Sequence, residues 1–250
     1  MNAVVLAAGV GKRLQPFTDV HPKSLLRFGE ETLLERHIKL LGGAGIEAIT
    51  IVIGHLAEQV REEVCRLKWP APLRLLHNAR YREGSALSLL TAADALSGTS
   101  SLVMDGDILY GRELLHRLIQ APWPNCLLAD PESRDSGEEV KVVVREDGRV
   151  CELGKRVHGG GRVVGESVGM FKFEPLAGKG LADRLRSATA SDPSIEYEPV
   201  IDGLLKEFRV DYVSVKGLPW TEIDFWGDVE RARAEVYPRL VRSGYTGVTD

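Results

Sequence analysis

The sequence predicts an α/β fold built on a doubly wound, mixed but mainly parallel sheet with a small β-rich extension. Apolar, β-branched segments alternate four times with helical patterns over residues 2–119, an order typical of parallel strands joined by crossover helices. The alternation stops after Pro124, where short strand patterns follow one another. The 250 residues, 44% apolar and 27% charged, have an ordinary globular composition and suffice for one good-sized core.

The first strand is expected at residues 2–8, an apolar run that ends in a glycine loop, as a strand buried on both faces does. Apolar residues at helical spacing predict a helix over 32–41, which Gly42 and Gly43 are expected to end. The alternation continues with strands at 48–53, 73–77 and 101–104 and helices at 56–67, 85–96 and 112–119. Ligands of such sheets bind beyond the carboxyl ends of the strands, so we look for chemistry there.

The second half is predicted to extend the same domain, because no linker or repeat interrupts the chain over 1–250. A turn at 146–148 joins two strands as a hairpin. The elements expected here are strands at 126–129, 140–145, 149–153, 163–173 and 210–215, and helices at 176–188, 198–208 and 226–237.

Charge and cysteine usage exclude several classes of protein. The formal net charge is −4, with both signs mixed along the chain, which argues against a nucleic-acid partner. Three widely spaced cysteines, Cys65, Cys126 and Cys151, suggest neither a zinc site nor a disulfide framework. The apolar N-terminal run ends at Gly9, too short for a signal peptide or a membrane span. We therefore expect a cytoplasmic protein without a membrane partner.

The loop Gly9-Val-Gly-Lys-Arg13 follows the first strand directly. Glycines let the backbone approach a ligand, and successive N–H groups bind anions. Arg13 and Lys23 add positive charge, so the segment reads as a phosphate site. It is not a Walker loop, and Leu14 occupies the place of the third glycine in a dinucleotide fingerprint, which disfavours an oxidoreductase. A tight turn with solvated lysines is the structural alternative.

Carboxylates occur at two further places. Asp105 and Asp107 follow the strand predicted at 101–104, and Glu222 and Asp224 precede the last predicted helix. Carboxylates at a strand end suit a hard cation such as Mg²⁺. Alternatively, the first pair caps the helix near Arg112, and Asp224 supplies a favourable charge at a helix N-terminus.

The string Leu6-Ala-Ala-Gly-x-Gly-x-Arg-Leu14, followed nine residues later by Lys23 in Pro22-Lys-Ser-Leu-Leu, resembles the opening of the nucleotidyltransferase family. That family includes sugar-1-phosphate nucleotidyltransferases and phosphocholine-type cytidylyltransferases. The resemblance implies a Rossmann-like nucleotidyltransferase fold and Mg²⁺-dependent transfer of a nucleoside monophosphate from an NTP to a small phosphorylated or phosphonate acceptor. It also implies that 1–122 binds the nucleotide and 123–240 the acceptor.

Residue roles follow from the same resemblance. Arg13 and Lys23 would be catalytic, neutralising the triphosphate, and Asp107 and Asp224 would hold Mg²⁺, with Asp105 as the second choice of ligand. No protein nucleophile is required, because an acceptor oxygen attacks directly. The nucleotide would be contacted by Leu6, Ala7, Ala8, Gly9, Gly11, Gly84, Ser85 and Asp105.

The chain resembles CTP-dependent cytidylyltransferases of the phosphocholine and phosphonate type more than the sugar enzymes. It is short, its Glu-Ile-Asp at 222–224 directly precedes the last helix, and 148–155 resembles a stretch of inositol-phosphate cytidylyltransferases. CTP is therefore the expected nucleotide. A uridylyl-, thymidylyl- or guanylyltransferase acting on sugar-1-phosphates is the alternative, and a regulatory module that binds nucleotide without turnover is another.

The acceptor side is less specified. A choline site requires an aromatic cage, for which Tyr197, Trp220 and Trp226 are candidates, but the stretch 138–141 lacks the cage tryptophan of the phosphocholine enzymes. Lysines instead favour an anionic acceptor, a phosphonate or phospho-alcohol, while Glu166 and Glu196 would bind hydroxyls or an amine; each is also plausible as a solvated strand residue. The expected acceptor-binding residues are Lys141, Lys155, Glu166, Tyr197 and Glu222. The oligomeric state stays open, with a homodimer as one candidate.

Overall fold

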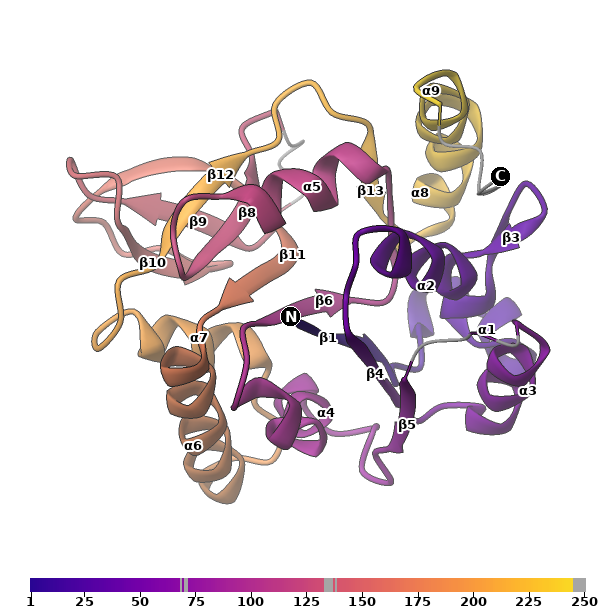
Figure 1. Ribbon diagram of the computed structural model, residues 1–250, viewed down its shortest axis with the longest axis horizontal. Coiled ribbons are helices and arrows are strands. Elements are labelled where there is room, and N and C mark those ends of the chain that lie inside the picture. Colours follow the sequence, from indigo (N-terminus) through magenta and orange to yellow (C-terminus); the bar gives the residue numbers. More distant parts are fainter. Residues whose placement is uncertain (68, 70–71, 133–136, 138, 245–250) are drawn as a thin grey trace.

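A parallel sheet forms the centre of the computed structural model, which describes residues 1–67, 69, 72–132, 137 and 139–244. Its strands lie in the order β6 (Ser101–Asp105), β1 (Asn2–Ala7), β4 (Ala48–Ile53) and β5 (Leu73–His77). These are the apolar segments that the sequence analysis assigned to strands. Figure 1 shows them side by side, with β1 between β6 and β4.

The long strand β11 (Arg162–Phe173) extends this sheet by pairing antiparallel with β6. It also pairs antiparallel with β8 (Cys126–Asp130) and with β9 (Lys141–Val144), which forms the predicted hairpin with β10 (Val150–Gly154). Strand β12 (Asp211–Ser214) completes the extension beside β8. The mixed, mainly parallel sheet with a β-rich extension is therefore confirmed, and β11 joins the two predicted halves in one sheet.

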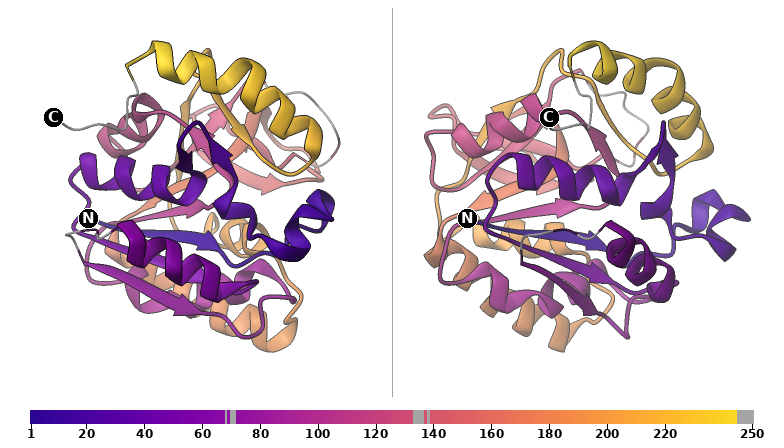
Figure 2. Two further views of the ribbon diagram at one scale, coloured as in Figure 1. Left: turned by 90° about the vertical axis from the view of Figure 1, so that its right-hand side faces the viewer. Right: turned by 45° about the vertical axis from the view of Figure 1, so that its right-hand side comes forward.

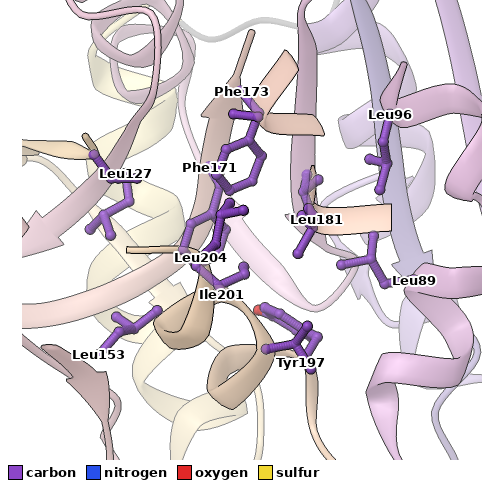
Figure 3. Close-up of a cluster of buried hydrophobic side chains, with 14 of the residues drawn as sticks. Leu89, Leu96, Leu127, Leu153, Phe171, Phe173, Leu181, Tyr197, Ile201 and Leu204 are labelled. Carbon is purple, nitrogen blue, oxygen red and sulfur yellow. The ribbon is translucent and has the colours of Figure 1, made fainter. Parts of the chain in front are cut away.

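Helices cover both faces of the sheet. One face packs against α4 (Ser85–Thr91), η3 (Ala93–Leu96), α6 (Pro175–Ser191) and α7 (Tyr197–Leu204), and the apolar cluster of this layer is drawn in Figure 3. The other face packs against α2 (Leu33–Gly43), α3 (Ala57–Leu67) and α5 (Arg112–Gln120). Burial of these two clusters is the main favourable contribution to folding.

A third apolar cluster lies beyond the carboxyl ends of the parallel strands. It joins two small ribbons, β2–β3 (Arg27–Phe28 and Glu31–Thr32) and β7–β13 (Ile108–Tyr110 and Trp220–Glu222), to the last helical segment. That segment runs through α8 (Trp226–Arg231), η4 (Ala232–Val236) and α9 (Tyr237–Arg242). Both views of Figure 2 place this segment and α6 on opposite sides of the sheet. The short elements η1 (Lys12–Leu14), α1 (Phe17–Val20) and η2 (Lys23–Leu25) follow β1.

Some predicted boundaries were wrong. Gly42 and Gly43 are the last residues of α2 rather than the residues that follow it. A side chain at Gly42 would collide with the Trp69 ring, so the glycine there serves close packing instead of ending the helix. The helix expected over 85–96 breaks into α4 and η3, and the last helix continues to Arg242. The three-residue strands of the β7–β13 ribbon were missed. Within the described residues, no helix is long and apolar enough to cross a membrane.

Candidate functional site

The carboxyl ends of β1 and β6 bring the glycine loop and the first carboxylates together. Leu6 lies opposite Asp105 in the parallel register, and the Gly106 N–H donates to the Leu6 carbonyl at 2.9 Å. The His55 N–H, after β4, donates to the Ala8 carbonyl at 3.0 Å. The loop that starts at Ala7 is therefore held between the ends of its two neighbouring strands, where ligands bind in such sheets.

The loop itself turns back at Gly11, whose φ of 65° is a conformation that glycine adopts without strain. The Gly11 carbonyl accepts from the Leu14 N–H at 2.9 Å and from the Thr18 hydroxyl at 2.8 Å. Gly9 is exposed, and nothing lies within 4 Å of where its side chain would begin. These contacts fix the loop while leaving backbone at Gly9 open to a ligand.

Lys23 stands at the centre of the charged groups. Its Nζ lies 2.7 Å from Asp107 Oδ2 and 2.7 Å from Asp224 Oδ1. Burial would lower the pKa of the Lys23 ammonium, but Asp107 and Asp224 outweigh burial and raise that pKa above its usual value. The Lys23 ammonium therefore bridges Asp107 and Asp224, two carboxylates that are 117 residues apart in the sequence (224 minus 107).

Arg13 lies on the exposed side of the same group. Its Nη1 is 3.2 Å from Asp224 Oδ2, and its guanidinium lies 4.9 Å from the centre of the Phe225 ring. Burial would raise the pKa of Asp224, but Lys23 and then Arg13 hold it below its usual value. Asp224 is therefore charged at neutral pH.

Asp224 is positioned by three hydrogen bonds that backbone N–H groups donate. The neighbouring Ile223 N–H donates to the Asp107 carbonyl at 3.1 Å, next to the β7–β13 ribbon. The N–H groups of Asp224 and Phe225 both donate to Asp228 Oδ2, at 3.0 and 2.8 Å. Asp228 thus caps the start of α8, so that Asp224 is available to Lys23 and Arg13 rather than acting as the helix cap.

Asp107, Glu222 and Asp224 form a compact acidic group, which we call the carboxylate trio. One oxygen of each lies within 4.8 Å of the others, a spacing that suits a shared cation. The Oδ1 atom of Asp107 is buried and has no hydrogen-bond partner among the described residues. Burial, followed by Asp107 and Asp224, raises the pKa of Glu222 to about 8. Oxygen ligands of this type bind divalent cations such as Mg²⁺.

Asp105 points away from the trio into a different interaction. Its Oδ2 accepts from the Tyr197 hydroxyl at 2.6 Å, and a side chain at Gly169, whose φ is 71°, would collide with the same oxygen. Burial, together with Asp107 and Glu222, raises the pKa of Asp105. Neither Asp105 nor Asp107 caps α5, whose N-cap is Gly111.

Gly84 and Ser85 connect the nucleotide side to the segment before α7. The Ser85 N–H donates to Glu196 Oε2 at 2.9 Å, and the Tyr197 N–H donates to Ser85 Oγ at 3.0 Å. A side chain at Gly84 would meet the Ile195 carbonyl at 2.0 Å, so glycine is required for this close approach. Glu196, a candidate for binding hydroxyls, instead accepts a backbone hydrogen bond, and α4 has no side-chain N-cap at Gly84.

The expected acceptor residues are partly brought together. A small cavity of about 110 Å³ adjoins the trio. The predicted residues that line it are Asp105, Lys155, Glu166, Tyr197, Glu222 and Asp224. Lys141 instead begins β9, opposite Glu166 in the register, and Glu138 lies outside the described residues.

The three aromatic candidates for a cage lie apart. Tyr197 is 3% exposed and belongs to the core cluster of Figure 3, where it lies near Ile201. The Trp220 Nε1–H donates to Asp130 Oδ2 at 2.6 Å, and Trp226 packs edge-on against Phe17. An aromatic cage built from these three is therefore absent from the described residues, because each ring has a separate environment.

Sequence reasoning missed several residues that shape this site: Asp130, Glu139, Gly169, Glu198 and Asp228. Asp228 carried a usable signal, since it lies three residues after Phe225, the N-cap residue of α8, as the acidic residue of a capping box does. The others lie far apart in the sequence, on strands, on a helix or, for Glu139, in the segment before β9, and have no local pattern.

Comparison with known proteins gives a consistent picture. Residues 3–194 match the MobA-like NTP transferase domain family. The chain is 27% identical over 228 residues to the 2-aminoethylphosphonate cytidylyltransferase of Lancefieldella rimae, covering 89% of this chain and 88% of that protein. It is 31% identical over 227 residues to the bifunctional IPC transferase and DIPP synthase of Rubrobacter xylanophilus, covering 90% of this chain. It spans about half of that bifunctional protein, 49%.

Among solved structures, the inositol-1-phosphate CTP transferase from T. maritima superposes with a TM-score of 0.81. The superposition covers 99% of this chain and 98% of that one, at 21% sequence identity. At this identity the similarity establishes a shared fold, including the β-rich extension.

Proposed function

The chain belongs to the MobA-like NTP transferase domain family and is a nucleotidyltransferase; from that premise we propose that it transfers CMP from CTP to a small phosphonate or phospho-alcohol. The choice of CTP draws on the relative from Lancefieldella rimae, a cytidylyltransferase of which the chain covers 88%.

The observation that carries the proposal is the bridging position of Lys23 between Asp107 and Asp224, directly after the glycine loop. Transfer of a nucleotidyl group places a polyanion beside a metal ion and requires positive charge where negative charge develops. Lys23 and Arg13 supply two cations there, next to the carboxylate trio. A site that merely binds a nucleotide has no need to combine two cations with a metal-ligating trio.

The trio fits a divalent cation. All three ligands are carboxylate oxygens with a common spacing, and Asp107 brings a buried oxygen that lacks a hydrogen-bond partner among the described residues. Asp107 and Asp224 would hold Mg²⁺, with Glu222 as a third ligand. When bound, Mg²⁺ would supply positive charge at the α-phosphate and the incoming acceptor.

The reaction requires no protein nucleophile. An oxygen of the acceptor phosphate or phosphonate attacks the α-phosphorus and forms a new P–O–P linkage. At the same time, the bond between the α-phosphorus and the oxygen that bridges it to the β-phosphorus breaks, and pyrophosphate leaves with that oxygen. Lys23 and Arg13 would orient the triphosphate and stabilise its charge. The open backbone at Gly9 and the loop at Gly84 and Ser85 would hold the ribose and base.

Pyrophosphate release tests the proposal. Purified protein with Mg²⁺ would be given each NTP in turn, with phosphonates, phospho-alcohols and hexose-1-phosphates as acceptors. We expect release with CTP and a phosphonate or phospho-alcohol, and a CMP conjugate of matching mass. Turnover restricted to UTP, dTTP or GTP with a sugar phosphate would replace the proposal by a sugar-1-phosphate nucleotidyltransferase. Tight NTP binding without release would indicate a regulatory module.

A further inference from the structure

The turn that follows β4 contacts the glycine loop at two places. It consists of Gly54, His55 and Leu56 and leads into α3. The His55 N–H donates to the Ala8 carbonyl at 3.0 Å, and the His55 ring nitrogen Nε2 lies 2.6 Å from the Thr18 carbonyl oxygen. One residue of a neighbouring strand end therefore holds the chain where it leaves β1 and again beyond the loop, at α1.

The His55 ring is the donor in its contact with Thr18. A carbonyl oxygen only accepts hydrogen bonds, so Nε2 of His55 carries a proton and donates it to the Thr18 carbonyl. His55 is 8% exposed, and its ring centre lies 6.0 Å from that of Tyr81. Because water has little access to this donor and acceptor, loss of the bond would leave buried polar groups unsatisfied.

The backbone of the turn allows this close approach. A side chain at Gly54 would lie 2.4 Å from Cβ of Tyr81 and 2.8 Å from the Ala8 carbonyl oxygen, so glycine is required there. Leu56 has a φ of 50°, a left-handed conformation that is unfavourable for a residue with a side chain. Such a conformation persists only where surrounding contacts hold it, and the two hydrogen bonds of His55 lie directly beside it.

Thr18 connects His55 to Gly11 and Lys23. The buried Thr18 hydroxyl donates to the Gly11 carbonyl at 2.8 Å. A side chain at Gly11 would lie 3.0 Å from the Thr18 methyl group and 3.3 Å from Cβ and Cδ of Lys23. Gly11 therefore packs tightly between Thr18 and Lys23, and the position of the Lys23 side chain depends on where Thr18 is held.

The same part of the chain makes a further contact with α1. Gln59, in α3, donates from Nε2 to the Val20 carbonyl at 2.8 Å. His55 and Gln59 thus hold two carbonyl groups of the short helix α1, which lies between the glycine loop and Lys23. The His55 contact is buried and the Gln59 contact is exposed, so we expect His55 to contribute more to the position of the loop.

We propose that His55 is a positioning residue for nucleotidyl transfer. Its ring holds Thr18, and through Thr18 it fixes the glycine loop and Lys23 in the arrangement that receives the triphosphate. His55 acts through the loop and not by contact with the substrate. This inference rests on the proposed function, in which the loop from Gly9 to Lys23 binds the nucleotide, and adds a residue from a neighbouring strand end on which the loop depends.

Steady-state kinetics of two variants tests the inference. His55→Phe keeps an aromatic ring without a donor, whereas His55→Gln keeps an N–H donor near the place of Nε2. With Mg²⁺ and an acceptor that is turned over, we expect His55→Phe to raise KM for CTP about tenfold, the scale of one buried hydrogen bond. KM for the acceptor should stay unchanged, and His55→Gln should restore most of the affinity for CTP. A wild-type KM for CTP in His55→Phe, or no recovery in His55→Gln, would overturn the assignment.

His77→Phe is the matched control, because His77 ends the neighbouring strand β5 and is exposed. It should keep the wild-type KM for CTP, and an equal rise in this variant would overturn the assignment. Thr18→Val removes the hydroxyl bond to Gly11 with little change of shape and should raise KM for CTP by a smaller factor. Thermal unfolding verifies that each variant folds. If His55→Phe does not fold, a wild-type KM for CTP in Thr18→Val would overturn the inference.

Amide hydrogen exchange of the ligand-free protein separates this inference from the proposed function. The N–H groups of Leu14, Asp19 and His21 donate to carbonyls of the same segment, so their exchange reports how often it opens. We expect faster exchange over residues 9–21 in His55→Phe and wild-type exchange in His77→Phe. If no NTP is turned over, the proposed function fails and this measurement still decides. Equal exchange in the wild type and His55→Phe would overturn the inference, whether or not CTP is turned over.

Discussion

The nucleotide side and the acceptor side of the site differ in how their charges are balanced. Beside the glycine loop, Lys23 and Arg13 pair with Asp107 and Asp224 at hydrogen-bonding distances. Across the trio, Glu166 lies near other carboxylates, and burial, followed by repulsion from Glu139 and Asp130, raises its pKa to about 7. In the first region Lys23 and Arg13 each form an ion pair, whereas in the second region Glu166 forms no ion pair with another described residue.

This difference indicates how each side meets its ligand. In the proposed reaction, a triphosphate with its metal ion would take over contacts that Lys23 and the carboxylates now make with one another. Lys23 and the carboxylates would then exchange contacts with one another for contacts with the ligand. The net interaction energy would change little, and the ligand would be held in a precise geometry. On the acceptor side, Glu166 has no ion pair with another described residue to exchange, so a group that binds it would add an interaction instead of replacing one.

The largest expected effect comes from Asp107→Ala, which removes one of the two carboxylates that pair with Lys23 on the nucleotide side. It removes a trio oxygen and leaves the buried Lys23 with one carboxylate. We expect kcat to fall by at least about a hundredfold, the usual scale for losing one preorganised charged group. Pyrophosphate release at saturating CTP measures it, over a range of Mg²⁺ concentrations. A near wild-type rate would remove Asp107 from the proposed site.

Lys23→Ala is expected to cost about a hundredfold in kcat as well, because the positive charge next to the α-phosphate is lost. Lys12→Ala provides the matched control, since Lys12 is an exposed lysine of the same loop. If both variants lose activity equally, general attraction of the triphosphate to a basic loop would explain the effect. A loss confined to Lys23→Ala would support a specific role.

How much could be predicted from sequence differs between the same two regions. The nucleotide side depends on a contiguous stretch from Leu6 to Lys23, where glycines, charges and a strand end follow each other locally. The sequence predicts these residues, and the strand that carries them, because the apolar strand pattern, the glycines and the charges all lie within a few residues of one another. Asp107 directly precedes β7 and Asp224 follows β13, and because these two strands pair antiparallel, the start of one lies beside the end of the other. Only the strand pairing reveals that the two carboxylates come together.

The acceptor side gave weaker predictions for a physical reason. Residue type indicated that Tyr197 and Glu196 were polar groups near a ligand, but their partners, Asp105 and the Ser85 N–H, lie about 90–110 residues away. Where a side chain points on a strand or helix end depends on such distant contacts. An acidic cavity of about 820 Å³, which Glu222 and Asp224 help to line, is likewise assembled from β8, β11, β13 and the last helical segment, and no local pattern marks it.

Tyr197→Phe sharpens the comparison by acting at the boundary between the two regions. It removes the hydroxyl that donates to buried Asp105 and leaves that carboxyl without its partner. We expect a loss of about 1–3 kcal/mol in the free energy of unfolding and a several-fold fall in kcat/KM. Chemical denaturation and steady-state kinetics measure the two effects. Unchanged stability would mean that the hydrogen bond contributes little, since Phe preserves the packing of the ring.

The smallest expected effect is a pH dependence of stability that distinguishes the two sides. Burial raises the pKa of Glu166 and of Glu198 to about 7 each, and that of Glu222 in the trio to about 8, so all three contribute slope of the same sign. Between the unfolded value near 4.5 and about 7, the folded protein binds more protons than the unfolded chain, so stability falls as pH rises. Asp224, with its lowered pKa, and Lys23, with its raised one, contribute no slope in this window.

We therefore expect the ligand-free protein to lose about 1 kcal/mol of unfolding free energy between about pH 5 and pH 8. The limit from a shift of this size is about 3 kcal/mol for each group, and solvent screening of partly exposed carboxylates reduces it. Urea denaturation across this range measures the slope. Glu166→Gln should reduce it, whereas Glu235→Gln, at an exposed residue of η4, should not; a slope of the opposite sign would mean that the acceptor-side carboxylates are compensated after all.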